Sequence, residues 1–415
     1  MAGNDRGKAS VQHVFIIGSK SIGQYGGYET FVDRIIGEHE HTPSIKYHIA
    51  CKANGDGYMD ESKLEGVKVL KRDTEGQVAE FEYKNAHVFK IQCPNIGPGV
   101  AIYYDRSAVL FSIKYSREHN IQSPIFYILT CRIGLFINGL VQKIHKIGGR
   151  YYLNPDGHEW KRAKWPAPVR RYWKWSEKKM VGLADLVICD SVNIERYIKS
   201  EYSSTNPTTT YIAYGADVTP SSLTDEDPKF QTWLRDHQLT IGSYYLVVGR
   251  FVPENNYETM IREFMKSKSS RDFALITNTN EKFLEELDQK LHWKNDNRIK
   301  FVGTVYDHEL LKKIRECAYG YFHGHEVGGT NPSLLEALGS TELNLLLDVG
   351  FNREVGEEAA LYWTKDEGSL SELIGMADSM SEDKRDEFGL KAKERIKSAF
   401  SWGFIGSEYK KTWQK

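Results

Sequence analysis

The stretch His323–Gly339, HGHEVGGTNPSLLEALG, joins the end of an apolar run to the start of a short helical pattern. Asn331 is a good N-cap, Pro332 suits the first helical position, and leucines form an apolar stripe before Gly339 ends the pattern. The free N–H groups and the positive dipole end of this helix therefore point back at Gly328–Thr330, where a phosphate can approach the backbone. The alternative interpretation is an ordinary capped helix after a glycine turn.

The same strand-then-helix alternation recurs along the chain. The apolar runs are His13–Gly18, Tyr47–Cys51, His87–Gln92, Ile125–Leu129, Leu186–Cys189 and Thr210–Ala213, and then Tyr244–Gly249, Phe273–Ile276, Ile299–Val302, Ala318–His323 and Leu343–Val349. This alternation predicts parallel sheets with helices on both faces, an α/β fold. At 415 residues the chain exceeds the size at which one core stops growing, so we expect two doubly wound domains. Ligands of such sheets bind beyond the carboxyl ends of the strands, so two facing domains predict a cleft.

Composition narrows the class of protein. The chain is 40% hydrophobic and 27% charged, as expected for a soluble globular protein, and its net charge of -1 excludes a generally basic one. The five cysteines lack metal-ligand spacing and predict reduced, mostly buried thiols. The longest apolar run, Ile125–Val141, is too short and too polar to span a bilayer and predicts a buried strand followed by a helix. Residues 1–12 have no signal-peptide core and are expected to be a loose end.

Glycines gather after the first predicted strand, in IIGSKSIGQYGGYETF. Gly18, Gly23, Gly26 and Gly27 do not follow the GxGxxG spacing of dinucleotide-binding loops. The pattern favours a loop in which a sugar or diphosphate lies against the backbone. A turn that needs positive φ is the alternative.

An arginine ends the first strand expected in the second domain. Arg250 stands at the carboxyl end of that strand, where a fixed cation can clamp a diphosphate and stabilise it as it leaves. A structural ion pair with Glu254 is the alternative. Glu336, one turn into the helix after Asn331, is placed to accept a hydrogen bond from a sugar hydroxyl near such a phosphate.

A basic, tryptophan-rich segment lies between the two halves of the pattern. From Gln142 to Gly182 there are eleven Lys and Arg against three Asp and Glu, and four tryptophans follow from position 160 on. Basic and aromatic side chains together suit the interface of an anionic membrane, and nucleic acid is the main competing partner. A solvated helix with tryptophans facing the core explains part of the segment. Asp156, His158 and Glu159 precede it and are candidates to orient or deprotonate an acceptor hydroxyl, although His158 also suits a turn.

No metal-binding or nucleophile motif is present. The sequence has no HExxH, Walker loop or nucleophile elbow, and its Asp-x-Asp at residues 225–227 falls in an acidic loop. We therefore expect neither a cofactor nor a required metal ion.

Several stretches resemble the bacterial rhamnosyltransferases of glycosyltransferase family 4, which act early in streptococcal capsule and rhamnan cell-wall polysaccharide synthesis. The matching stretches are YGGYETFV (25–32), NPDGHEWKRAKW (154–165), YIAYGAD (211–217), VVGRFVPENNYET (247–259), FVGTVYDHELL (301–311), the stretch 323–339 and FSW (400–402). They are spread over nearly the entire chain.

The resemblance implies a GT-B fold with two Rossmann-like domains facing across a cleft. It places an acceptor-binding domain at 1–217, a linker at 218–240, a nucleotide-sugar-binding domain at 241–390 and a C-terminal helix at 391–415 that returns to the first domain. It implies a retaining hexosyltransferase of β-1,4-rhamnosyltransferase type that uses dTDP-β-L-rhamnose. The expected acceptor is glucose or N-acetylglucosamine on undecaprenyl diphosphate. The protein is then expected in the cytoplasm, bound peripherally to the inner leaflet of the plasma membrane, with no nucleic-acid partner.

Two departures from the family pattern change the expected site. Family members have a Glu-x7-Glu motif, whereas here Gly328 stands eight residues before Glu336 and the nearest upstream carboxylate is Glu326. A lysine commonly follows the strand arginine by five residues, and here that position is Asn255. We therefore expect Arg250 and the amides of residues 328–331 to carry more of the diphosphate charge.

These arguments give one set of candidate residues. The catalytic candidates are Arg250, Asp156 and Glu326; the donor-binding candidates are Gly26, Gly27, Arg250, Asn255, Glu326, Gly328, Gly329, Thr330, Asn331 and Glu336; and the acceptor-binding candidates are Asp156, His158, Glu159, Trp160, Lys161 and Arg162. We expect a front-face reaction in which the donor's phosphate oxygen takes the acceptor proton, assisted by Asp156. The rival functions are a GT-B nucleotide-sugar epimerase and a nucleic-acid-binding or membrane-binding module.

Overall fold

The computed structural model describes residues 11–24, 26–162, 165–279 and 281–415. Three expectations lie partly outside these residues, namely the loose end at 1–12, the YGGYETFV stretch at Tyr25 and the basic segment at residues 163 and 164. The chain divides into two compact units. The first comprises residues up to Trp160, Trp165–Ile212 and Ile405–Lys415, and the second comprises Lys161, Arg162 and Ala213–Phe404.

Within the described residues, the first unit contains a nine-stranded sheet in the order β3-β4-β5-β2-β1-β6-β7-β8-β9. Its strands are β1 (Gln12–Ile17), β2 (Ile45–Lys52), β3 (Lys68–Arg72), β4 (Val78–Tyr83), β5 (Ala86–Ile91), β6 (Ile125–Leu129), β7 (Arg150–Asn154), β8 (Leu186–Cys189) and β9 (Thr209–Tyr211). The strands pair in parallel, except that β4 is antiparallel to β3 and β5. The order reverses between β1 and β6, so ligands are expected at that point.

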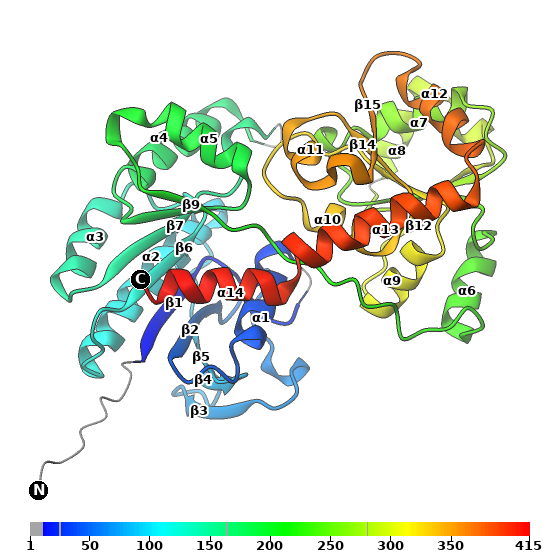
Figure 1. Ribbon diagram of the computed structural model, residues 1–415. Coiled ribbons are helices and arrows are strands. Elements are labelled where there is room, and N and C mark those ends of the chain that lie inside the picture. Colours follow the sequence, from blue (N-terminus) through cyan, green and yellow to red (C-terminus); the bar gives the residue numbers. More distant parts are fainter. Residues whose placement is uncertain (1–10, 25, 163–164, 280) are drawn as a thin grey trace, which may run out of the picture. The chain divides into compact units, whose positions relative to one another are not determined.

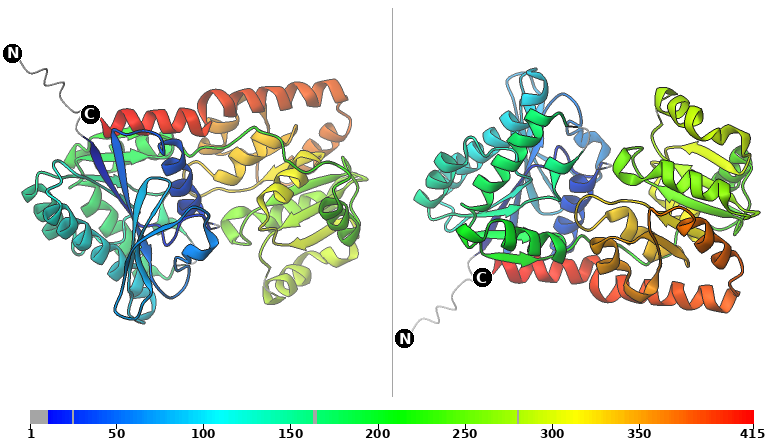
Figure 2. Two further views of the ribbon diagram at one scale, coloured as in Figure 1. Left: turned by 90° about the horizontal axis from the view of Figure 1, so that it is seen from below. Right: turned by 90° about the horizontal axis from the view of Figure 1, so that it is seen from above.

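Helices cover both faces of this sheet (Figures 1 and 2). They are α1 (Gly27–Glu38), α2 (Val100–Glu118), α3 (Ile137–Lys146), α4 (Ala167–Val181), α5 (Val192–Glu201) and α14 (Trp402–Trp413). Successive strand residues point to opposite faces. On one face, Phe15 and Phe126 belong to a buried cluster with residues of α2, α3, α4 and α5. On the other face, the ring of Tyr409 in α14 lies 5.4 Å from that of Phe31 in α1.

Within the described residues, the second unit contains a six-stranded, all-parallel sheet in the order β12-β11-β10-β13-β14-β15. The strands are β10 (Tyr244–Val248), β11 (Asp272–Ile276), β12 (Ile299–Gly303), β13 (Gly320–His323), β14 (Asn344–Leu347) and β15 (Leu361–Trp363). The helices are α6 (Pro228–His237), α7 (Tyr257–Lys266), α8 (Glu281–Leu291), α9 (His308–Glu316), α10 (Pro332–Ser340), α11 (Gly350–Gly356), α12 (Ser369–Asp378) and α13 (Glu382–Ala399). Separate buried clusters fill the two faces, with α7 and α12 on one face and α6 and α9 on the other.

Every strand expected from the sequence is present, and so is the helix after Ile125–Leu129. β3, β4, β7 and β15 were not expected. β7 has the sequence RYYLN, in which only Leu153 is aliphatic. The sequence therefore lacks the apolar run that predicts a strand, although four of its five residues are buried. The cysteines are free, and four of the five are buried.

Three element boundaries differ from expectation. Residues 218–240, expected as a linker, contain α6, because Phe230, Trp233 and Leu234 are buried in the second unit's core. Gly339 does not end its helix but lies inside α10, where an added Cβ would come within 2.6 Å of the Asp217 carbonyl oxygen. The expected C-terminal helix is two helices, α13 and α14, because the backbone around Ser401 pairs with Ala216.

The helices of the described residues were also compared with the length and hydropathy that a membrane span needs. None of them is long and apolar enough to cross a bilayer.

Candidate functional site

The loops after β10 and β13 meet at the point where the second sheet reverses its strand order. β10 and β13 are neighbours, with Tyr245 beside Gly320 and Leu246 beside Tyr321. From β10 the chain moves outward to β11 and β12, and from β13 it moves the other way to β14 and β15. Such a switch point is where open α/β sheets bind ligands. The loops Gly249–Asn256 and Gly324–Asn331 therefore form the candidate site of this unit.

Hydrogen bonds hold these two loops together. The Asn256 side-chain amide donates to the Gly324 carbonyl at 2.8 Å, and the Glu326 N–H donates to the Glu254 carbonyl at 3.0 Å. Asn255 bridges the loops, since its Nδ2 donates to the Arg250 carbonyl at 2.7 Å and its Oδ1 lies 2.7 Å from His325 Nδ1. The strand arginine is thus fixed beside the glycine turn, although the two are far apart in sequence.

Arg250 itself is exposed, and no ion pair joins its guanidinium to any residue the structure describes. The alternative interpretation, an ion pair with Glu254, is therefore not what this structure contains. The Glu254 carboxylate is 7% exposed, and its Oε2 has no hydrogen-bond partner among the described residues. A cation with no protein partner at a strand end remains available for an anionic ligand.

His325 is a neutral side chain next to Arg250. Burial is the main cause that lowers the pKa of His325 to about 4, and the positive charges of Arg162 and Arg250 act in the same direction. Because Asn255 Oδ1 can only accept, His325 Nδ1 carries the proton that joins them. His323, at the end of β13, is buried as well, and burial lowers its pKa well below the usual range.

The start of α10 has the geometry that the sequence predicts. Asn331 is the N-cap, and its side chain accepts a hydrogen bond from the Ser333 N–H at 2.9 Å. Gly328 has a φ of 133°, which side chains disfavour, and Gly329 and Thr330 are buried. The N-terminus of this nine-residue helix lies against the end of β10, where Ser333 Oγ donates to the Val248 carbonyl at 3.0 Å. A helix N-terminus is the end that favours anions.

Glu336 is held by an arginine that the sequence did not single out. Its Oε2 lies 2.6 Å from the Arg315 guanidinium, which is buried on α9, while the Glu336 side chain stays 41% exposed. Arg315 also lies 3.4 Å from Ser333 Oγ. One carboxylate oxygen is thus fixed, and the other is left to accept a hydroxyl hydrogen bond.

Glu326 forms an ion pair with Lys365, which follows β15. This pairing brings a third loop to the same edge of the sheet. Asn255, also a donor-binding candidate, uses its amide to join the loops and keeps one N–H and one lone pair for a ligand. The donor roles of both residues stay predictions.

The glycine loop after β1 contains two kinds of glycine. Gly18 has a φ of 125°, and an added Cβ would lie 2.6 Å from the Leu129 carbonyl oxygen. Gly23 has a φ of 67°. The backbone therefore needs glycine at these two positions, which agrees with the alternative interpretation of the loop as a turn with positive φ. Gly26 is extended at φ 163°, but a Cβ added to it would lie 2.1 Å from Glu29 Oε2, so the Glu29 side chain would have to move. No described residue lies within 4 Å of a Cβ added to Gly27. Neither backbone conformation therefore requires glycine.

The acceptor-binding candidates form the loop after β7. Asp156 and His158 have left-handed φ values of 59° and 48°, which cost free energy for residues other than glycine. The Asp156 N–H donates to Asn154 Oδ1 at 2.8 Å, and Asp156 Oδ1 accepts from the Gly157 N–H at 2.8 Å. The His158 ring packs 4.2 Å from that of Tyr197, and buried Glu159 accepts from Trp165 Nε1 at 2.8 Å.

The remaining acceptor candidates are divided between the units. Trp160 lies under the Lys174 ammonium, which is 4.6 Å from its ring centroid. Lys161 and Arg162 group with the second unit rather than with the first, where the sequence placed them. Of the other tryptophans, Trp173 packs against the core of the first unit, so the core-facing alternative holds there, whereas Trp175 is exposed.

Sequence reasoning missed three charged residues at the two switch points. Arg315 and Lys365 hold the two candidate carboxylates of the second unit, and Arg132 of the first unit donates to the Gly18 carbonyl at 3.2 Å and pairs with buried Asp105. Burial raises the pKa of Asp105 to about 6 in spite of this pair. An arginine three residues after the end of the apolar strand Ile125–Leu129 was the available signal for Arg132.

The described residues contain no group of three or more His, Cys, Asp and Glu side chains placed to hold a metal ion. Whether the protein needs a metal stays a prediction.

Comparison with known proteins sets this architecture in context. Residues 11–217 match a domain of unknown function, DUF1972. No curated protein sequence matches the chain. Among solved structures, sucrose-phosphate synthase from Thermosynechococcus elongatus has a TM-score of 0.71 at 16% identity, covering 97% of this chain and 98% of that one. A glycosyltransferase from Rickettsia africae has a TM-score of 0.71 at 12% identity, covering 98% of each chain.

The chain has the GT-B fold. Anabaena Alr3699/HepE, solved in complex with UDP and glucose, has a TM-score of 0.66 at 13% identity and covers 98% of this chain and 100% of its own. The expected fold class is therefore confirmed. At these identities the likeness establishes the fold, and the reaction has to be argued from the site.

Proposed function

We propose that this protein is a glycosyltransferase that binds a nucleotide-sugar donor at the switch point of its second unit. The observation that carries the proposal is the convergence of Arg250, the α10 N-terminus and Glu336 at the carboxyl edge of β10 and β13. This set offers one cation, the positive dipole end of a helix and a hydroxyl acceptor, which together suit a nucleoside diphosphate. The UDP complex of a protein with the same fold supports a nucleotide-sugar donor.

The finer proposal rests on the sequence resemblance. The donor is dTDP-β-L-rhamnose, and the acceptor is glucose or N-acetylglucosamine carried on undecaprenyl diphosphate. The product keeps the β configuration, as in a retaining β-1,4-rhamnosyltransferase of capsule or rhamnan synthesis. The protein would then work at the inner face of the plasma membrane, without nucleic acid and without a required metal ion.

In the proposed reaction, the departing diphosphate is stabilised by Arg250 and the amides of residues 328–331. Preorganised charge of this kind is usually the largest contribution to catalysis. His325 is neutral at pH 7, so it adds no second cation, and its bond to Asn255 fixes the loop that carries Arg250. The acceptor hydroxyl attacks the face from which the diphosphate leaves and passes its proton to the donor's phosphate oxygen. Asp156 assists by orienting that hydroxyl.

The test is incubation of the protein with dTDP-rhamnose and glucose-diphosphate or N-acetylglucosamine-diphosphate lipids, followed by mass analysis. The expected product is the acceptor lipid plus one deoxyhexose. A nucleotide-sugar isomer formed without acceptor would instead identify an epimerase. If neither product forms and dTDP and UDP leave the melting temperature unchanged, the site does not bind nucleotides and the proposal is wrong.

A further inference from the structure

Three large apolar side chains of the first unit are exposed close to one another. Leu135 is 65% exposed, Phe136 37% and Trp175 42%. Leu135 and Phe136 belong to the loop after β6, and Trp175 belongs to α4. We call these three residues the Leu135 patch. A monomeric protein rarely exposes a group of large apolar side chains without a partner.

Hydrogen bonds fasten the loop after β6 to α4. Ser176 Oγ donates to the Cys131 carbonyl at 2.6 Å and accepts from the Gly134 N–H at 2.9 Å. Tyr172 Oη donates to the Arg132 carbonyl at 2.7 Å, and its ring lies 5.9 Å from that of Trp175. A Cβ added to Gly134 would lie 2.6 Å from Ser176 Cα, so only glycine allows this approach. The Leu135 patch is therefore presented by a rigid support.

Positive charge surrounds the patch. Arg170, Arg171, Lys178 and Lys179 on α4 are exposed, and none forms an ion pair with a residue that the structure describes. The guanidinium of Arg106 lies 5.1 Å from the Phe136 ring centroid. The carboxylates near this part of α4 are already engaged, because Glu177 is buried and accepts from Tyr197 and Tyr202, and Glu201 pairs with Lys174 at 2.8 Å.

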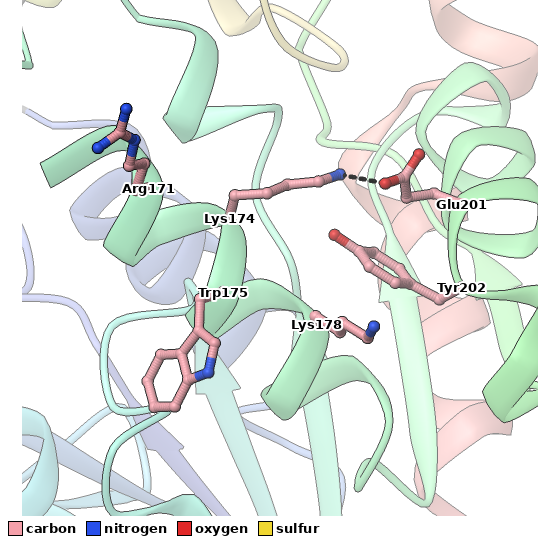
Figure 3. A pocket seen from close by; sticks show the side chains of 6 residues that line it. All are labelled: Arg171, Lys174, Trp175, Lys178, Glu201 and Tyr202. Carbon is pink, nitrogen blue, oxygen red and sulfur yellow. Dashed lines mark ion pairs between the residues drawn. The ribbon is translucent and has the colours of Figure 1, made fainter. Parts of the chain in front are cut away.

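A hollow of about 310 Å³ lies on the same helix, lined by Arg171, Lys174, Trp175, Lys178, Glu201 and Tyr202 (Figure 3). In Figure 3, Lys174 reaches to Glu201, while the Arg171 guanidinium and the Trp175 indole point away from that ion pair. The two unpaired cations of this hollow suit the phosphate of a lipid headgroup. Exposed apolar side chains beside unpaired cations are complementary to the interface of an anionic bilayer.

The patch lies on the same side of the first sheet as the acceptor candidates. The loop with Leu135 and Phe136 follows β6, and the loop with Asp156 and His158 follows β7, which is parallel and adjacent to β6. Carboxyl ends of neighbouring parallel strands share one edge of a sheet. A lipid surface at the patch would therefore be close to the loop that is proposed to bind a lipid-linked sugar.

We propose that the Leu135 patch and the basic face of α4 are the surface by which this protein docks on a bilayer containing anionic lipids. Leu135 and Phe136 enter the interfacial region, Trp175 lies at headgroup level, and the exposed arginines and lysines bind headgroup phosphates. The suggestion that docking brings a lipid-linked acceptor close to its binding loop rests on the proposed function. The docking on the bilayer does not depend on that function.

The experiment is co-sedimentation of the full chain with phosphatidylcholine vesicles, with and without phosphatidylglycerol. The wild-type protein is expected to bind the anionic vesicles and to be released by high salt. The double variant Leu135→Ser/Phe136→Ser should bind at least roughly tenfold more weakly, because both apolar side chains would no longer be buried in the interface. The triple variant Arg171→Gln/Lys178→Gln/Lys179→Gln should lose the preference for phosphatidylglycerol.

The control variant is Leu390→Ser, which removes a 70% exposed leucine from α13 in the second unit and should bind vesicles like wild type. The melting temperatures of all variants and their affinities for dTDP should match those of wild type. The substituted side chains are all exposed, and none of them belongs to the proposed donor site. Wild-type affinity of the double variant would overturn the proposal. So would a wild-type protein that ignores vesicles and self-associates through the patch. Vesicle binding without any sugar transfer would contradict the proposed function and leave the docking surface standing.

Discussion

Arg250 and Glu336 show how single side chains acquire a role from the loops around them. Arg250 has no carboxylate partner among the described residues, and Asn255 fixes its backbone by a 2.7 Å hydrogen bond. Glu336 has a partner, Arg315, that occupies only one of its oxygens. One residue is thus kept available for an anion, and the other is kept in a fixed orientation toward a hydroxyl group.

Replacing Arg250 by alanine should lower turnover roughly a hundredfold or more, the usual loss for one preorganised charge donor in the transition state. The measurement is kcat/KM for the donor, with product followed by mass analysis. Arg235→Ala is the matched control, because Arg235 is an exposed arginine on α6 of the same unit. A rate near that of wild type for Arg250→Ala would discard the assignment.

Replacing Glu336 by glutamine should weaken dTDP binding roughly tenfold to a hundredfold, since a hydrogen bond to a charged group contributes about 1.5–3 kcal/mol. A dTDP ribose has only the 3′-hydroxyl to offer, so Glu336 cannot select dTDP over UDP. UDP binding should therefore weaken at least as much, which calorimetric titration of both nucleotides would measure. Weakened dTDP binding with unchanged UDP binding would contradict this role.

At the scale of elements, four strands of the first sheet are joined by hydrogen bonds through Glu80 and three histidines. Glu80 of β4 accepts from His87 Nε2 at 3.1 Å, which leaves His87 Nδ1 to accept from His48 Nδ1 at 3.0 Å. His48 Nε2 then accepts from His13 Nδ1 at 2.9 Å. Every bond in this chain is satisfied when all three rings are neutral.

Acid should therefore destabilise the first unit. Burial, with help from the neighbouring histidines and Lys46, lowers the pKa of His48 well below its usual 6.5, and burial also lowers the pKa values of His13 and His87. A lowered folded pKa means that the unfolded chain binds more protons, so this stability is complete above about pH 6.5 and is lost as the pH falls below it.

Thermal unfolding at pH 7.5 and 5.5 tests this expectation. The melting temperature of wild type should fall by at least about 3 °C between these pH values. His48→Gln should show a smaller fall in melting temperature, because the most buried of the three histidine rings has been removed. His41→Gln, at an exposed histidine, should behave like wild type. An equal fall in His48→Gln and wild type would refute the idea.

At the scale of the molecule, the last residues of the chain complete the first unit. Residues from Ile405 on belong to it, although the preceding α13 belongs to the second. Trp413 is fully buried, and its Nε1 donates to Tyr47 Oη at 2.8 Å, while Tyr409 Oη lies 3.0 Å from Tyr127 Oη. The end of the chain thus covers part of one face of the first sheet, beside α1.

Trp413→Ala should destabilise the first unit by about 3–5 kcal/mol, the typical cost of truncating a buried aromatic side chain. Denaturant unfolding followed by tryptophan fluorescence measures the shift in midpoint. Trp175→Ala removes an exposed tryptophan and should shift the midpoint little. Similar midpoints for both variants would show that α14 contributes no more than a surface helix.

The sequence predicted those parts of the site that depend on neighbouring residues. Asn331, Pro332 and Gly328 predict the capped helix because an N-cap, a first-turn proline and a glycine turn act within a few residues of one another. The prediction that Gly339 ends its helix is wrong. Glycine is needed there because the Asp217 backbone, more than a hundred residues away in sequence, leaves no room for a Cβ. The sequence of residues 218–240 predicts a linker, whereas the structure has α6 there. Its three apolar side chains are too few to predict a helix, and it is the core of the second unit that buries them.

Alternating apolar runs by themselves determined the α/β class and the positions of most strands, because burial on both faces leaves a continuous apolar signature. They could not determine which strand lies beside which, and it is this order that brings the loop of Arg250 together with the loop of His325 and Gly328. Only the tertiary structure decided that Glu336 pairs with Arg315, that Glu326 pairs with Lys365, and that the loop before Leu135 is hydrogen-bonded to α4. Local propensity acts over a few residues, whereas these contacts depend on how distant segments pack.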